Sequence, residues 1–208
     1  MSCILRIAMK PRSLYLLRHA QSAASLEVEE VQWPLSHLGK RQATALADLL
    51  APLSIERVYS SPYLRARQTV EPFAEKTGLR LILDNALGER RLSKDALARF
   101  GEVWRRSWDD LDYAPLGCES SLEAQERFAG AVRRIVHQTA AETIAVCSHG
   151  HVIGLFLRHL DGALGRERTE ALRNPDALRI DVSGTEWALD GAFELPGLDE
   201  VAAGLFRA

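Results

Sequence analysis

Short apolar runs that stop abruptly at polar residues constrain the fold of this chain more than any other feature of its sequence. Four runs suit buried strands, since each is short, apolar and bounded by polar residues. Segments with helical periodicity lie between them at residues 35–53 and 64–76, and this alternation predicts βαβ units. The four runs are residues 14–17, 57–60, 79–83 and 143–148. The expected fold is a three-layer α/β/α arrangement with a mostly parallel sheet flanked by helices.

The second half of the chain predicts an insertion and a sheet edge. Residues 93–141 have an almost continuous helical pattern, which is too long for a single crossover between strands. A helical cap insertion around residues 93–120 is therefore expected over the carboxyl edge of the sheet. Residues 177–182 and 187–189 flank a turn and predict a hairpin at one sheet edge. No internal repeat or linker divides the chain, so residues 1–208 are expected to form a single domain.

Charge and cysteine content limit the partners and the compartment. A formal net charge of −2, with 47% hydrophobic and 26% charged residues, gives no general attraction for nucleic acid or anionic membranes. No apolar run is long enough to span a bilayer. Met1–Arg12 lacks the order of a secretory signal and is interpreted as a short extension or an edge strand. Cys3, Cys118 and Cys147 are too scattered for a disulfide framework, which favours the cytoplasm.

Polar side chains with complementary chemistry are concentrated where the predicted strands end. Arg18 and His19 follow the first strand, Arg65 opens the helix after the second, Glu89 comes shortly after the third, and His149 follows the fourth. In open α/β sheets, reacting groups lie just beyond the carboxyl ends of the strands. A neutral imidazole is a nucleophile, and guanidinium groups fit phosphate oxygens. This combination favours phosphoryl transfer through a phosphohistidine.

The order and spacing of five motifs match those of a known family. Residues 18–22 read Arg-His-Ala-Gln-Ser, residues 34–43 read Pro-Leu-Ser-His-Leu-Gly-Lys-Arg-Gln-Ala, and residues 60–69 read Ser-Ser-Pro-Tyr-Leu-Arg-Ala-Arg-Gln-Thr. Farther on come Gly-Cys-Glu-Ser at 117–120 and Ser-His-Gly at 148–150. Through these motifs the chain resembles the histidine phosphatase superfamily, also called the phosphoglycerate mutase-like superfamily. The resemblance implies a small phosphatase that works without a metal or another cofactor.

The resemblance also implies roles for individual residues. The expected nucleophile is His19, and the expected proton donor is Glu89. Arg18, Arg65 and His149 complete the catalytic set. The expected phosphate-binding residues are Arg18, Gln21, Ser22, Ser25, Arg65 and Gly150.

Three positions depart from the pattern of the family. Gln21 stands where many members carry Glu, and Ser25 stands where many carry Asn. Glu89 is followed by Arg-Arg-Leu-Ser instead of the common Gly-x-Trp-Glu-Gly run. Because this departure flanks the proton donor, Glu119 is kept as the alternative acid.

Other patterns are interpreted as structural. His149 and His151 have a spacing that can ligate a metal, but no nearby carboxylate completes a site, and no metal is expected. The acidic run at residues 109–112 lacks the glycine and the distal glutamate of a calcium loop. Trp104 and Trp108 lie one helical turn apart and favour packing, with a role as a binding platform left open because the cap is where substrates are sorted.

The sequence therefore predicts a cytoplasmic, metal-independent phosphatase that hydrolyses phosphate monoesters through phospho-His19, as a histidine acid phosphatase-type hydrolase. The expected partner is a phosphorylated small molecule or a phosphate ion. A phosphoglycerate-type mutase and a non-catalytic regulatory protein that binds a phosphorylated ligand are the alternatives. No basic-aromatic insert of the kind expected in a mutase is present, and the intact set of His19, Arg18, Arg65 and His149 argues against a purely binding role. The pattern selects neither one substrate nor an oligomeric state.

Overall fold

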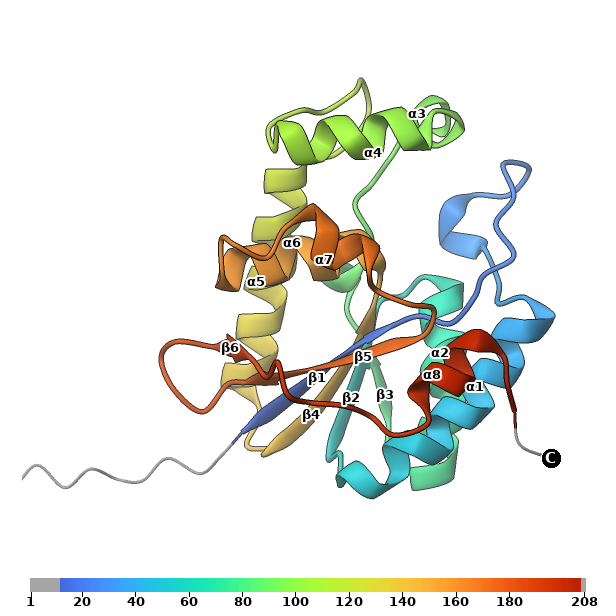
Figure 1. The fold of residues 1–208 in the computed structure, drawn as a ribbon, viewed down its shortest axis with the longest axis vertical. Coiled ribbons are helices and arrows are strands. Elements are labelled where there is room, and N and C mark those ends of the chain that lie inside the picture. The colour runs from blue at the N-terminus through green and yellow to red at the C-terminus, as the bar shows by residue number, and fades with distance from the viewer. Residues whose placement is uncertain (1–11, 207–208) are drawn as a thin grey trace, which may run out of the picture.

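Within the described residues, 12–206, six strands form one mixed sheet at the centre of the computed structural model (Figure 1). The extension or edge strand predicted at Met1–Arg12 lies outside this range except for Arg12. Cys3 also lies outside it. The spatial order is β3-β2-β4-β1-β5-β6, with β1 to β4 parallel and the last two strands antiparallel. The predicted mostly parallel sheet, with a hairpin at one edge, is confirmed. The strands are β1 (Ser13–Arg18), β2 (Arg57–Ser60), β3 (Leu81–Leu83), β4 (Thr143–Ser148), β5 (Asp176–Asp181) and β6 (Ala188–Leu189).

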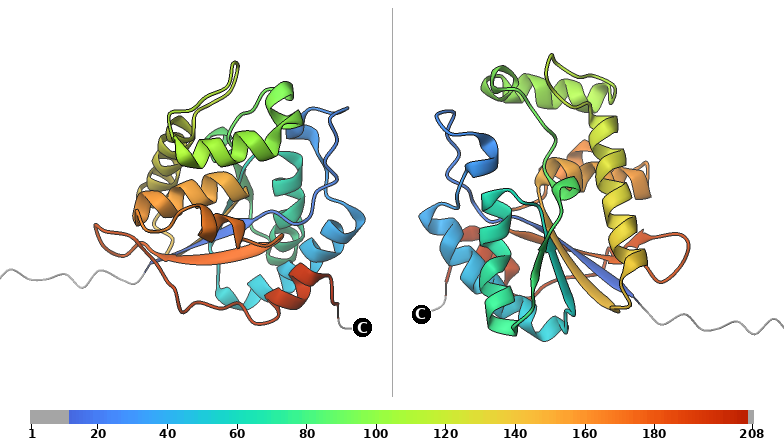
Figure 2. Two further views of the ribbon diagram at one scale, coloured as in Figure 1. Left: turned by 45° about the horizontal axis from the view of Figure 1, so that its top comes forward. Right: turned by 180° about the vertical axis from the view of Figure 1, so that it is seen from behind.

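Alternate residues of the central strands face two separate apolar cores. In β1, Leu14 and Leu16 belong to one core, and Tyr15 and Leu17 belong to the other. Successive side chains of a strand point to opposite faces of the sheet. A strand whose side chains are apolar on both faces must therefore be covered by other elements on both faces. Helices lie on both faces of the sheet (Figure 2), which confirms the three-layer prediction. The covering helices are α5 (Ser121–Gln138) and α6 (Gly150–Leu160) on the first face, and α1 (His37–Leu50) and α2 (Leu64–Thr77) on the second.

Local capping signals fix where the long helices begin and end. The Ser36 side chain accepts the Gly39 N–H at the start of α1, as expected for a helix N-cap. The predicted helix over 35–53 is shorter in the structure, because α1 ends at Leu50 and continues as a 3₁₀ turn, η2 (Ala51–Leu53). Helix α5 begins with a capping box between Ser120 and Glu123, which satisfies two free N–H groups at once.

The helical stretch predicted at residues 93–141 contains three helices and a loop. Two of them, α3 (Lys94–Ala98) and α4 (Phe100–Asp109), stand beyond the carboxyl ends of the parallel strands (Figures 1 and 2). A loop then returns the chain to α5. The two short helices therefore occupy the place expected for a cap, and the division into one domain with a cap insertion stays a prediction.

Several short elements were not expected from the sequence. They are the 3₁₀ turns η1 (Glu30–Gln32) and η3 (Asn85–Leu87) and the helices α7 (Arg166–Glu170) and α8 (Leu198–Ala203). Each is too short to produce a clear periodic pattern. Among the helices of the described part, none combines the length and the apolar character that crossing a membrane requires.

Candidate active site

The two histidines predicted for the site lie side by side at the carboxyl edge of the sheet. Strands β1 and β4 pair in parallel with Arg18 opposite Ser148, so the next residues, His19 and His149, are also neighbours. The His19 N–H donates to the Ser148 carbonyl at 3.0 Å, and the two imidazole centroids are 5.2 Å apart. The sheet register therefore brings together two residues separated by 130 positions.

The environment of His19 leaves one ring nitrogen available for attack. Its Nδ1 lies 2.7 Å from the Ala20 carbonyl. A carbonyl can only accept, so Nδ1 carries the proton and Nε2 is the unprotonated nitrogen, whose lone pair can act as a nucleophile. Burial, and then the charge of Arg65, hold the pKa of His19 well below its ordinary value. The ring is therefore neutral at physiological pH.

Two guanidinium groups flank this nucleophile. Arg65, in the first turn of α2, donates from Nε to the Nε2 of His19 at 3.2 Å. Arg18 donates from Nη1 to the Leu172 carbonyl at 2.5 Å, and its buried Nε has no hydrogen-bond partner among the described residues. Gly150 packs against Arg18, and a Cβ at that position would lie 3.0 Å from the guanidinium carbon. A phosphate group at His19 can thus be reached from two sides by cations.

His149 lies deeper than the cavity wall. Its Nε2 is 2.8 Å from the Ser61 hydroxyl, and its buried Nδ1 has no partner among the described residues. Burial, followed by the charge of Arg65, holds its pKa well below the ordinary value. A neutral ring retains one N–H donor.

Glu89 lies at the amino end of α6. Its carboxylate accepts the N–H groups of Arg90 at 2.9 Å and of His151 and Val152 at 3.1 Å each. Glu89 follows β3 after the short 3₁₀ turn η3. The N–H groups at a helix start orient the carboxylate, and this contact sets its position.

Glu119, the alternative proton donor, is engaged in a buried ion pair. Arg127 contacts its two oxygens at 2.7 and 2.8 Å, and Arg91 lies 3.4 Å away. Burial alone would raise the pKa of Glu119, but the hydrogen bonds from Arg127 and from the Arg91 backbone outweigh it and hold the pKa below its usual value. Glu119 does not line the cavity at His19. Its surroundings are those of a structural carboxylate.

Arg65 makes a contact that was not expected from the sequence. Glu30, in η1, lies against this guanidinium with its side chain only 13% exposed. Arg65 donates from one terminal nitrogen to the Glu30 carboxylate at 2.7 Å and from the other to the Glu30 carbonyl at 2.8 Å. Burial raises the pKa of Glu30, although the charge of Arg65 acts in the opposite direction. The Glu30 carboxylate thus pairs with Arg65, one of the arginines expected to bind phosphate.

These groups surround a cavity of about 320 Å³. Of the predicted site residues, it brings together Arg18, His19, Ser22, Arg65, Glu89 and Gly150. Gln21 and Ser25 do not line it: Gln21 accepts from the Ser36 hydroxyl, and the Ser25 hydroxyl accepts the Glu27 N–H. The lining residues missed from the sequence are Glu30, Trp33, Arg90, Leu92, Leu97, Phe100 and His151. Trp104 also lines the cavity, while Trp108 is buried behind it.

The His149-x-His151 spacing does not make the two rings converge. His151 packs against the Trp104 ring at 4.5 Å between centroids, whereas His149 faces Ser61. Burial, followed by the charge of Arg90, lowers the pKa of His151 to about 3. Over residues 12–206, no three His, Cys, Asp or Glu side chains lie together as a set of metal ligands.

The comparison with known proteins agrees with this geometry. The family described as histidine phosphatase superfamily (branch 1) matches residues 14–193. A Cronobacter sakazakii protein named probable phosphoglycerate mutase is 28% identical over 212 residues, covering 90% of this chain and 98% of its own. A mycobacterial glucosyl-3-phosphoglycerate phosphatase, solved with inorganic phosphate, is 26% identical with a TM-score of 0.68, covering 86% of this chain and 95% of its own.

A third relative is similar at the level of the fold. The Bacillus stearothermophilus protein YhfR has a TM-score of 0.72 at 21% identity, covering 90% of this chain and 99% of its own. The family match spans Arg18, His19, Arg65 and His149. The chain belongs to the histidine phosphatase superfamily, branch 1.

Proposed function

We propose that this protein is a phosphatase that hydrolyses phosphate monoesters through a phosphohistidine on His19. The observation that carries the proposal is the unprotonated Nε2 of a neutral His19, held beside the guanidinium groups of Arg18 and Arg65 in one cavity. The mycobacterial relative solved with inorganic phosphate supports the ligand class. The finer assignment, a histidine acid phosphatase-type monoester hydrolase located in the cytoplasm, is part of the same proposal.

The first chemical step transfers the phosphoryl group to the protein. Arg18 and Arg65 hold the equatorial oxygens, and His149, behind the cavity wall, packs against the His19 ring. The Nε2 of His19 attacks phosphorus in line, so that an N–P bond forms while the P–O bond to the leaving group breaks. The leaving oxygen takes a proton from Glu89, which lines the cavity.

The second step returns the protein to its starting state. Water attacks the phosphohistidine on the face left by the alcohol and loses its proton to Glu89. An O–P bond forms, the N–P bond to His19 breaks, and inorganic phosphate leaves. The charged groups of the cavity stabilise the developing charge without rearranging at the moment of reaction.

The alternative of a phosphoglycerate-type mutase rests on the name of the Cronobacter sakazakii relative. A mutase would return the phosphoryl group from His19 to a second hydroxyl instead of to water. A binding protein without turnover, the other alternative, would hold a phosphorylated ligand with the same cations and form no covalent intermediate.

Trapping the intermediate tests this function. The protein is mixed with ³²P-labelled ester in the presence of a chelator, quenched within milliseconds, and assayed for label that is stable in base and lost in acid. The expected result is a phosphohistidine that His19→Ala cannot form, with phosphate release that survives chelation. The matched control is His37→Ala, because His37 is exposed. Label on serine or aspartate, or a divalent ion required for release, contradicts the proposal, and label passed to an added alcohol in preference to water favours the mutase.

A further inference from the structure

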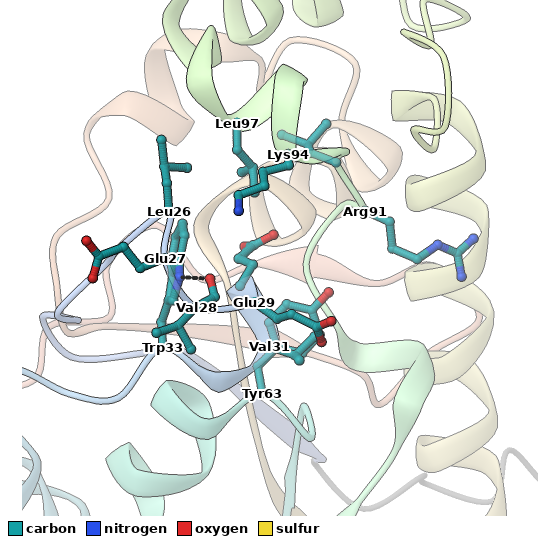
Figure 3. Close-up of a pocket in the computed structure, with 12 residues that line it drawn as sticks. Leu26, Glu27, Val28, Glu29, Val31, Trp33, Tyr63, Arg91, Lys94 and Leu97 are labelled. Carbon is teal, nitrogen blue, oxygen red and sulfur yellow. Dashed lines mark hydrogen bonds between the residues drawn. The ribbon is translucent and has the colours of Figure 1, made fainter.

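Figure 3 shows a second cavity, of about 500 Å³. It adjoins the cavity at His19. The two share Glu30, Trp33, Leu92 and Leu97 in their walls. A group attached to the ester oxygen of a phosphate at His19 can therefore extend from the first cavity into the second. The shared residues define the passage between them.

Apolar side chains from two distant segments face each other across the second cavity. Figure 3 shows Leu26, Val28 and Trp33 on one side and Leu97 on the other. Leu26 is 45% exposed and Val28 is 48% exposed. Of the six exposed large apolar side chains in the described part of the chain, these two and Phe100 line the two cavities. Exposed apolar side chains that cluster around a cavity indicate a binding site for an apolar group.

The wall formed by residues 26–33 is held in place by the catalytic machinery. The Trp33 indole N–H contacts the carbonyls of Ser25 at 2.7 Å and of Val28 at 3.1 Å. Arg65, which also contacts His19, holds the Glu30 carbonyl. The apolar wall is therefore built onto the phosphate site and presents a formed surface to the leaving group.

Charge at the passage selects against anions. Glu30 is the one charged residue that the two cavities share, and the other three shared side chains are apolar. The cations of the second cavity, Arg91 and Lys94, are exposed, and Arg91 is paired with Glu119. Exposed cations are screened by solvent and attract a second anion weakly, and the carboxylate at the passage, which is paired with Arg65, offers that anion no favourable contact.

We propose that the second cavity is the leaving-group subsite and that the substrates are phosphate monoesters of elongated, apolar, uncharged alcohols. This proposal rests on the phosphatase function proposed above. It predicts that affinity grows with the apolar length of the leaving group and falls when that group carries a second anion.

Binding of non-hydrolysable n-alkylphosphonates, from methyl to octyl, tests the subsite by calorimetry. Each methylene that enters the cavity should lower Kd by about fourfold until the cavity is filled. Val28→Ser and Leu97→Ser should flatten this dependence, while Leu116→Ser should not, because Leu116 is 98% exposed and lines neither cavity. Since Val28 is exposed, its replacement tests the subsite even if Leu97→Ser fails to fold. A Kd that is independent of chain length overturns the proposal.

Phosphonates that end in a carboxylate test the charge selection. A carboxyalkylphosphonate should bind at least tenfold more weakly than the alkyl compound of the same length, and Glu30→Gln should reduce this ratio. Equal or tighter binding of the carboxylate would mean that Arg91 or Lys94 grips a second anion, and it would overturn the substrate class.

Failure of this inference is distinguishable from failure of the proposed function. Phosphonate binding requires no turnover. The dependence of Kd on alkyl chain length can therefore be measured even if no phosphohistidine forms. Conversely, a labelled His19 with a flat phosphonate series leaves the phosphatase in place and removes only the apolar subsite.

Discussion

At the scale of single residues, the reactivity of the site follows from burial combined with one well-placed acceptor. The Ala20 carbonyl fixes the proton on Nδ1 of His19, and burial keeps the ring neutral. An exposed histidine would be partly protonated near its ordinary pKa of about 6.5 and free to change tautomer. The same two causes, local backbone geometry and burial, account for the orientation of Glu89 and the neutrality of His149.

Replacement of Glu89 by Gln tests the proton donor. A general acid matters most when the leaving oxygen is strongly basic. The rate of the phosphorylation step should therefore fall strongly with an alkyl ester and much less with an aryl ester. The expected loss with the alkyl ester is on the order of 10²–10⁴-fold. The measurement is rapid-quench timing of the phosphorylation step, because loss of the carboxylate also slows the hydrolysis step. Equal losses for both esters would remove Glu89 from the acid role.

The contact between Glu30 and Arg65 predicts competition between a carboxylate of the chain and the ligand. Glu30→Gln removes a negative charge from a guanidinium that phosphate must engage, while the carbonyl contact of Glu30 to Arg65 is retained. Orthovanadate should therefore inhibit the variant on the order of tenfold more strongly, the equivalent of about 1.4 kcal/mol. The matched control is Glu29→Gln, an exposed neighbour without a contact to Arg65 in the structure. Weaker inhibition of Glu30→Gln would show that the carboxylate supports anion binding.

The residues of the site differ in how far the sequence could predict them. Arg18, His19 and His149 follow clear apolar runs, and parallel strands place such exits at one edge. Glu30 gave no signal, because its contact with Arg65 depends on the path of an irregular loop that spans residues 22–34. The exclusion of Gln21 and Ser25 from the cavity has the same cause, since the Gln21 side chain bonds to Ser36 across the ends of that loop and the Ser25 hydroxyl bonds within it.

At the scale of elements, the long helices and the central strands are encoded locally, and the short elements depend on packing. The apolar run of β1 is visible in the sequence, and the structure buries its alternate residues in the two cores. The five-residue helix α7 has no such signal, and it is placed by contact with α6. Tertiary packing therefore decides the elements that are too short for periodicity to be read.

Two glycine substitutions separate packing from helix propensity. Gly154, in α6, lies against α7, and a Cβ there would come within 1.9 Å of the Thr169 hydroxyl oxygen. Gly154→Ala should destabilise the protein by about 1–3 kcal/mol, as overpacking does. Gly130, in α5, has open space around it, so Gly130→Ala should stabilise by about 0.5–1 kcal/mol. Urea unfolding measures both, and a loss of stability at Gly130 or none at Gly154 would contradict the packing described for α6.

At the scale of the whole molecule, the site carries a cost in stability that depends on pH. His19, His149 and His151 are buried, and burial lowers the pKa of each. In the unfolded chain these rings regain ordinary pKa values of about 6.5. Below that pH the unfolded state therefore binds protons that the folded state does not, so stability falls as the pH is lowered.

The expected slope is large compared with the stability of a typical domain. Each histidine contributes up to about 1.4 kcal/mol per pH unit below pH 6.5, so three contribute about 4 kcal/mol per unit, against total stabilities of about 5–15 kcal/mol. Urea unfolding at pH 7.5, 6.5 and 5.5 should give a small loss of stability between the two higher pH values and a loss about three times as large between pH 6.5 and 5.5. Glu119 contributes little in this range, because its pKa is held below its usual value.

Replacing one buried ring assigns the effect to the histidines. His151→Phe keeps an aromatic ring against Trp104 and removes one titrating group, so the loss between pH 6.5 and 5.5 should shrink by about one third of its value. His37→Ala is the control, because an exposed histidine has nearly the same surroundings in both states. A stability that stays constant down to pH 5.5 would mean that the folded protein protonates these rings, and the neutral His19 on which the proposed chemistry depends would then be lost at the same pH.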